Sequence, residues 1–134
     1  MESPKTRDER IGWYRRMLER AGYVPEVYPG EVRFKHEGGT YQILAYDDQT
    51  YVAVVFPRFW SFKTPEERAR AVVAACATTT GTKAAKVLLT EDNHVSAAVE
   101  LFCSPPEALE PVLDLAITSL KYAVKSFKEQ VAAS

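Results

Sequence analysis

The sequence predicts an α+β domain in which helices pack on an antiparallel sheet, as a two-layer sandwich. Three observations lead to this class: three similar helix-start signals, a hydrophobic period that changes from 3.6 to 2 between them, and short turns between successive strands. The expected order is αβββαββα, with a five-stranded sheet. Because 134 residues that are 46% hydrophobic suffice for one core, we expect a single domain over residues 1–134, with residues 1–5 frayed.

Each predicted helix begins with a hydroxyl residue that is followed three positions later by glutamate. Such a pair can satisfy backbone N–H groups left open in the first helical turn. The pairs are Thr6 with Glu9, Thr64 with Glu67, and Ser104 with Glu107. The helices are expected over about Arg7 to Ala21, from Pro65 until Gly81 ends the run, and from Pro105 to about Val131.

Alternating apolar residues predict the strands between the helices. Residues 31–36 and 41–45 form a hairpin around a two-residue loop, Gly38-Gly39. After a turn at 47–49, the apolar run 51–56 forms a third strand, which Pro57 stops. Residues 83–90 and 95–103 form the last two strands around a turn at 91–94.

The charge balance excludes a global positive field. The 17 basic and 18 acidic residues give a net charge of -1, so we expect no nucleic-acid partner. Charge is nevertheless uneven, because residues 87–120 contain no Lys or Arg, whereas residues 7–20 contain five arginines. The acidic and the basic segment are either ordinary solvated surfaces or surfaces that bind a charged protein partner or a second copy of the chain. The charged N-terminus and the lack of a long apolar run predict a cytoplasmic protein without membrane contact.

The residues that carry common active-site chemistry are sparse. The six glycines form neither a P-loop nor a dinucleotide-binding motif, and His36 and His94 have no neighbours at metal-ligand spacing. Cys76 and Cys103 lie in apolar surroundings, which indicates reduced core thiols. We therefore expect no enzyme activity, no catalytic residue, no metal and no cofactor.

An aromatic segment at residues 57–62 is a candidate partner surface. Its rings, Phe59, Trp60 and Phe62, either plug one end of the core or dock a peptide. The alternative function is that of a small enzyme or a small-ligand-binding protein. Its pocket would lie near His36, Tyr41 and the aromatic loop at residues 57–62.

The second helix is apolar on both sides. Its expected core stripe is Ala69, Val72, Val73, Cys76 and Thr80. The other side carries small residues, Ala71, Ala74, Ala75 and Thr78. Because one sheet covers only one side, we expect these small residues to form the seam of a homodimer.

Several segments resemble a known family. The runs at residues 33–41 (RFKHEGGTY), 57–60 (PRFW) before 66–69 (EERA), and 83–86 (KAAK) leading to 99–102 (VELF) are similar to the YbjN-like bacterial sensory transduction regulators. The resemblance covers nearly the whole chain. It implies the fold of type III secretion chaperones, which are dimeric, non-enzymatic protein binders, and it supplies no catalytic residues. The expected function is a non-enzymatic, chaperone-like protein-binding module with a regulatory role and a protein partner of unknown identity.

Overall fold

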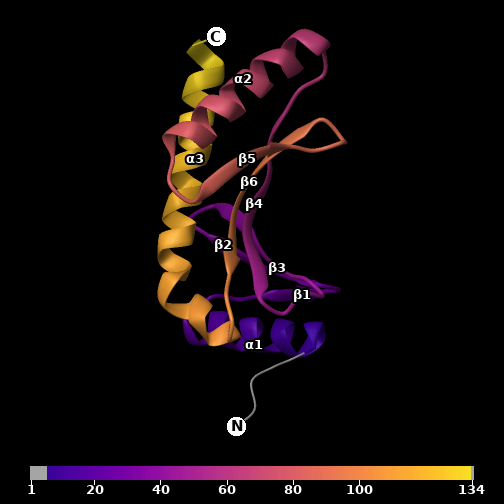
Figure 1. Ribbon diagram of the computed structural model, residues 1–134, viewed down its shortest axis with the longest axis vertical. Coiled ribbons are helices and arrows are strands. Elements are labelled where there is room, and N and C mark those ends of the chain that lie inside the picture. The colour runs from indigo at the N-terminus through magenta and orange to yellow at the C-terminus, as the bar shows by residue number, and fades with distance from the viewer. Residues whose placement is uncertain (1–5, 134) are drawn as a thin grey trace. The chain divides into compact units, whose positions relative to one another are not determined.

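The computed structural model describes residues 6–133, which form three α-helices, one 3₁₀ helix and six strands (Figure 1). The elements are α1 (Arg7–Arg20), β1 (Glu26–Tyr28), β2 (Glu31–His36), β3 (Gly39–Ala45), β4 (Tyr51–Ser61), α2 (Pro65–Gly81), β5 (Ala85–Leu89), β6 (His94–Phe102), η1 (Pro106–Val112) and α3 (Leu113–Ala133). The strands form an antiparallel sheet in the order β1-β2-β3-β4-β6-β5. The α+β class is confirmed, but the sheet has six strands instead of the expected five.

The described chain divides into two compact units. Unit 1 contains residues 6–55 and 100–114, and unit 2 contains residues 56–99 and 115–133. The long strands β4 and β6 contribute to both units. A single domain over the whole chain stays a prediction, and the expected fraying of residues 1–5 lies outside the described residues.

The first helix lies where its capping signals predict. Thr6 Oγ1 accepts a hydrogen bond from the Glu9 N–H at 3.1 Å, and Gly22 has a φ of +94° just after the C-cap residue. In unit 1, α1 contacts β1, β2 and β3, and Figure 1 shows it in indigo beside β1. The buried apolar side chains of this unit include Ile11, Tyr14, Met17 and Leu18 on α1 and Val32, Phe34, Tyr41 and Ile43 on the strands.

The β2–β3 hairpin is confirmed, with its loop one residue earlier than expected. His36 pairs with Gly39, so Glu37 and Gly38 form the loop in place of Gly38-Gly39. Both loop residues have positive φ, 49° and 81°. Two successive residues of positive φ give the turn whose twist matches the flanking strands.

Strand β1 is the element that the sequence analysis missed. It has three residues and no buried side chain, so it shows no alternating apolar pattern. A two-residue turn, Pro29-Gly30, joins it to β2, and Gly30 has a φ of +76°. A Pro-Gly pair is a recognised turn signal and could have revealed this hairpin.

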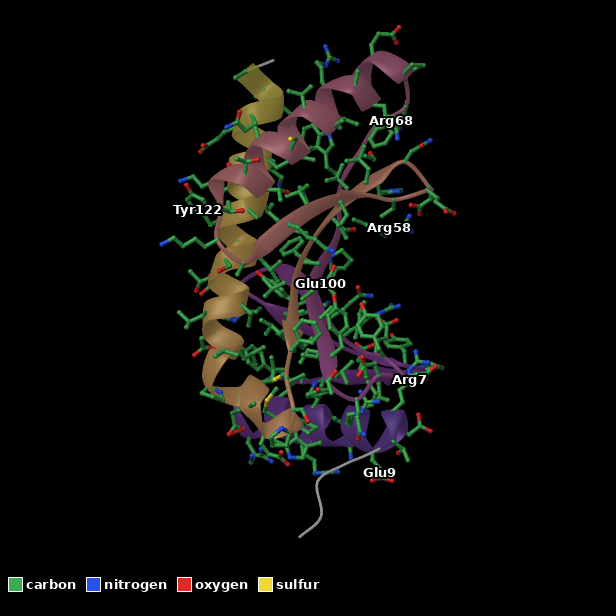
Figure 2. The ribbon with its side chains drawn as sticks, in the orientation of Figure 1. Arg7, Glu9, Arg58, Arg68, Glu100 and Tyr122 are labelled. Carbon is green, nitrogen blue, oxygen red and sulfur yellow. The ribbon has the colours of Figure 1, made fainter. Side chains whose placement is uncertain are left out.

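Strand β4 continues past Pro57 to Ser61, so the expected stop at Pro57 is wrong. Arg58 adopts a φ of +52°, and its N–H donates to Ser96 Oγ at 2.9 Å. Its guanidinium, labelled in Figure 2, lies 2.6 Å from the Asp92 carboxylate. A strand can pass a proline where its ladder is locally irregular. The aromatic segment is therefore mainly strand, which corrects the expectation of a loop.

The third helix begins later than its sequence signal predicts. A 3₁₀ helix over Pro106–Val112 precedes α3, and its N-cap residue, Pro105, makes no side-chain capping hydrogen bond. Pro106 and Pro111 explain the delay, because a proline lacks an N–H and disfavours α conformation in the preceding residue. The predicted start at Pro105 with Ser104 as the cap is wrong.

Candidate functional site

The two faces of α2 are reversed relative to the sequence prediction. Within unit 2, the predicted seam residues are buried, namely Ala71, Ala74, Ala75 and Thr78. The predicted core residues Val72 and Val73 are instead 42% and 66% exposed, and Cys76 is also exposed. The predicted seam is therefore wrong, since these residues pack inside their own chain.

Close packing of α2 against β5 explains the reversal. The two elements are in contact, and Thr79 Oγ1 accepts a hydrogen bond from the Val87 N–H at 2.9 Å. Small side chains let a helix approach a strand closely, whereas two valines at the same place would hold it away. Apolar or small residues therefore remain on the solvent side, at Ala69, Val72, Val73, Cys76, Ala77 and Thr80.

The two cysteines are free, and only one of them is in a core. Cys103 is buried as expected, and burial raises the pKa of its thiol. Cys76 is exposed, which corrects the expectation of a core thiol. Because a raised pKa disfavours the thiolate, Cys103 is a poor nucleophile.

The candidate partner surface of the aromatic segment packs on α3 in unit 2. The rings of Phe59 and Trp60 lie 5.4 and 5.9 Å from the ring of Phe127, measured between centroids. Phe62 is buried, while Phe59 and Trp60 are half-buried. Phe62 is therefore in the core, whereas Phe59 and Trp60 pack on α3 and stay partly exposed, and peptide docking on the three rings stays a prediction.

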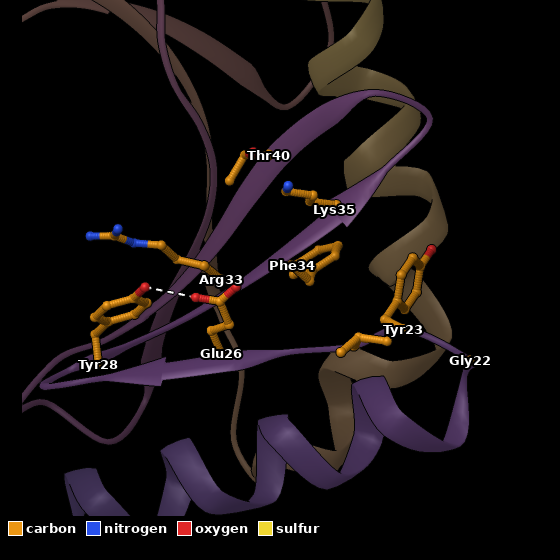
Figure 3. Close-up of a pocket in the computed structure, with 9 residues that line it drawn as sticks. Gly22, Tyr23, Glu26, Tyr28, Arg33, Phe34, Lys35 and Thr40 are labelled. Carbon is orange, nitrogen blue, oxygen red and sulfur yellow. Dashed lines mark hydrogen bonds between the residues drawn. The ribbon is translucent and has the colours of Figure 1, made fainter.

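A groove at the edge of β2 has a volume of about 560 Å³ (Figure 3). It is lined by Gly22, Tyr23, Val24, Glu26, Tyr28, Arg33, Phe34, Lys35 and Thr40, all in unit 1. We call it the β2-edge groove. Figure 3 shows Tyr23 and Phe34 toward one end and Glu26 and Tyr28 toward the other.

The groove opens where β1 ends and β2 continues. β1 pairs with β2 as far as Glu26 opposite Arg33, whereas β2 runs on to His36. The Ala45 N–H donates to the Gly30 carbonyl at 3.0 Å, which sets the phase of the β2–β3 ladder. Because Gly30 bonds to β3, every second residue from Gly30 directs its N–H and C=O toward β3, and the residues between them, Glu31, Arg33 and Lys35, direct theirs toward β1. The ladder therefore gives the backbone of Lys35 no strand partner on this side.

The walls of the groove differ in chemistry. One wall is aromatic, because the Tyr23 and Phe34 rings lie 5.0 Å apart. The other is polar: the Arg33 guanidinium lies 4.1 Å from the Tyr28 ring centroid and 2.8 Å from Glu31 Oε1. The Tyr28 hydroxyl donates to Glu26 at 2.8 Å, and this bond raises the pKa of Tyr28. The exposed Lys35 stands on the same strand.

His36 and Tyr41 lie beside the groove and do not line it. His36 Nδ1 is 3.3 Å from the Tyr23 hydroxyl, so the imidazole supports the aromatic wall. Tyr41 is buried, and its burial raises its pKa to about 12. None of residues 57–62 lines this cavity, so the expected pocket joining His36 to the aromatic segment is not formed by the β2-edge groove.

Residues 6–133 contain no group of three or more His, Cys, Asp or Glu side chains placed to hold a metal ion. Within the same residues, no helix has the length and apolar character needed to cross a membrane.

Comparison with known proteins identifies the fold. No family model matches the chain, and no curated protein matches it. The structure is similar to the crystal structure of YbjN from E. coli, which is described as a candidate transcription regulator. The two share 11% identity with a TM-score of 0.65, and the match covers 90% of this chain and 93% of YbjN. The chain therefore has a YbjN-like fold, three helices on a six-stranded antiparallel sheet.

Proposed function

We propose that this chain is a non-enzymatic, chaperone-like protein-binding module that captures an extended segment of another protein in the β2-edge groove. The observation that carries the proposal is the position of Lys35, whose backbone lies at the open edge of a strand and which helps to line a cavity of about 560 Å³. An extended chain can add to such an edge through main-chain hydrogen bonds, while pockets for alternate side chains select its sequence.

The groove walls define the segment. A strand beside β2 directs successive side chains to opposite faces. One set would meet the half-buried Tyr23 ring, which packs on the buried Phe34 and favours an apolar residue. The next would lie near Lys35, which favours an acidic residue. The expected segment therefore alternates apolar and acidic side chains.

A regulatory role is supported by the similarity to YbjN, whose description is that of a regulator and not of an enzyme. This chain has a net charge of -1, which disfavours direct contact with nucleic acid. We therefore assign regulation to contacts with proteins.

A small-ligand-binding function is the second candidate, and the size of the same cavity favours it. A volume of about 560 Å³ lies within the range of sites for small molecules. Such a ligand would use the aromatic wall and would not need the Lys35 N–H.

The test compares two substitutions of one residue. Lys35→Pro removes the N–H that faces the open edge, whereas Lys35→Gln keeps it and removes the charge. A proline is tolerated at an edge position whose N–H has no ladder partner. Peptides selected by phage display on the wild type are measured by calorimetry on all three proteins, after urea unfolding has shown that both variants fold.

We expect Lys35→Pro to weaken peptide binding at least about tenfold, because it removes a hydrogen bond and places a ring in the path of the strand. Lys35→Gln should weaken it by about threefold, the effect of one exposed charge. Selected peptides that bind Lys35→Pro as tightly as the wild type would refute strand addition. Small compounds that bind both proteins equally, with no peptide selected, would favour the second candidate.

A further inference from the structure

Three aromatic side chains lie together at one end of three neighbouring strands in unit 1. Tyr46 directly follows β3, Tyr51 begins β4 and Phe102 ends β6. The ring centroids of Tyr46 and Tyr51 are 5.0 Å apart, and those of Tyr51 and Phe102 are 5.6 Å apart. We call these three residues the aromatic corner.

The aromatic corner is open to solvent. Phe102 is 85% exposed, Tyr46 is also exposed, and Tyr51 is half-buried between them. Neighbouring ring planes are inclined by 56° and 60°, so the rings form walls of different orientation and do not cover one another as a parallel stack would. The ring of Phe102 is therefore accessible to a ligand, and exposed aromatic side chains are enriched where proteins bind other proteins.

Carboxylates flank the aromatic corner. The Tyr51 hydroxyl donates a hydrogen bond to Glu100, which is labelled in Figure 2. Burial raises the pKa of Tyr46, and the negative charge of Glu100 adds to this increase, so Glu100 acts on both tyrosines. Asp47 and Asp48 follow Tyr46 in the chain, and the Asp47 side chain is 97% exposed. These charges favour a cationic ligand.

Two arginines approach the same region and reduce its negative charge. Arg7 Nη1 lies 3.9 Å from Asp47 Oδ1, a long contact that leaves the carboxylate open to solvent. Arg10 is buried, and its Nη2 donates to the Tyr46 carbonyl at 2.6 Å, so its charge lies below the surface. The surface itself therefore carries more carboxylates than guanidinium groups. Glu100 and Phe102 also belong to the segment 87–120, which contains no Lys or Arg.

We propose that the aromatic corner docks an arginine-containing segment of a partner protein. The occupant follows from charge complementarity, because a guanidinium is attracted to the face of an aromatic ring and also pairs with carboxylates. Arginine fits better than lysine, since its planar group is more weakly hydrated and stacks on rings. One arginine would stack on Phe102, and a second would pair with Asp47.

This surface is separate from the β2-edge groove. No residue of the aromatic corner lines that groove, and the groove favours acidic and apolar side chains, whereas the corner favours basic ones. The proposal therefore stands or falls independently of strand addition at Lys35.

A nuclear magnetic resonance titration of the full isotope-labelled chain tests the docking. The probe is a blocked pentapeptide in which two arginines alternate with three glycines. We expect the amide signals of Tyr46, Tyr51 and Phe102 to shift and saturate. The matched peptide carries citrulline, which has a similar shape without the charge, and should bind at least about tenfold more weakly. Equal binding of the two peptides, or shifts that leave the corner unaffected, would refute the proposal.

Substitutions of Phe102 separate a cation–π contact from apolar docking. Phe102→Leu keeps an apolar side chain and removes the ring, so it should weaken peptide binding about two- to fivefold. Phe102→Trp offers a stronger ring face and should tighten binding about twofold. The matched control is Tyr122→Leu, which removes an exposed ring of α3 and should leave the affinity unchanged. A Phe102→Leu variant that folds normally in urea unfolding and binds as tightly as the wild type would overturn the proposal.

Asp47→Asn tests the carboxylate. It should weaken peptide binding about two- to threefold at low salt and have little effect at high salt, because exposed charges are screened. An equal affinity at low salt would show that no arginine pairs with Asp47 and would contradict the proposed arrangement.

Two further measurements separate the arginine segment from other occupants. N-acetylarginine amide offers one guanidinium in place of two and should bind at least about threefold more weakly than the peptide. Equal affinity would assign the aromatic corner to a free small cation and overturn the protein partner. Amide signals of the corner should not change when the protein alone is diluted. A change on dilution would assign the corner to a contact with a second copy and would also overturn the proposal.

Discussion

Two adjacent residues of α2 offer a direct test of which face of the helix is buried. Ala74 is 2% exposed and Val73 is 66% exposed, so Ala74→Glu and Val73→Glu place the same carboxylate on opposite sides. At Ala74 the carboxylate must lose its hydration or force α2 away from its packing. Either outcome should lower the free energy of unfolding by at least about 3 kcal/mol.

Val73→Glu should cost far less. About a third of the valine side chain is covered, so the lost burial is worth roughly 0.5–1 kcal/mol. The higher helix propensity of glutamate offsets a few tenths of a kcal/mol of this loss, by about the difference between straight-chain and β-branched residues. Since a domain is stable by only about 5–15 kcal/mol, the two variants should differ clearly.

Urea unfolding followed by far-UV circular dichroism measures both variants, at protein concentrations low enough to keep the wild type monomeric. Equal destabilisation, or a larger loss in Val73→Glu, would show that the valine face is the buried one. That result would restore the original seam at Ala71, Ala74, Ala75 and Thr78.

Three further outcomes can be measured by the same unfolding assay. Burial raises the pKa of Tyr14 and of Tyr41 from 10.0 to about 12, so the native state retains protons that the unfolded chain releases. The free energy of unfolding should therefore be constant up to about pH 10 and fall between pH 10 and 12, by up to about 2–3 kcal/mol per tyrosine. The fall should be smaller in Tyr41→Phe. Arg10 is 1% exposed, and its Nε and Nη1 have no hydrogen-bond partner, although Nη2 donates to the Tyr46 carbonyl. Arg10→Met should therefore raise the free energy of unfolding by about 1 kcal/mol. A decrease of similar size would show that the contacts of the guanidinium outweigh the cost of burying its charge. Thr64→Ala should cost about 1 kcal/mol because it removes the cap of α2, whereas Ser104→Ala should change stability by less than about 0.5 kcal/mol.

Sequence patterns predicted those elements whose local and tertiary preferences agree. α1 and α2 begin directly after their capping threonines. Each threonine hydroxyl accepts a hydrogen bond from the N–H of the glutamate three residues later, a group that has no partner within the helix. The β2–β3 hairpin follows its alternation, because one side of each strand packs in the core of unit 1. Errors arose where a local signal competed with its neighbours, as at Pro106 and Pro111, which delay α3 despite the signal at Ser104.

The candidate sites were harder to predict than the fold. The β2-edge groove depends on where β1 ends, and a three-residue strand without buried side chains has no periodicity to detect. The α2 faces depend on the distance between helix and strand. Hydrophobicity alone favoured Val72 and Val73 for the core, but contact with β5 selects the smaller Ala71 and Ala74. Size, more than apolar character, decided which face is covered.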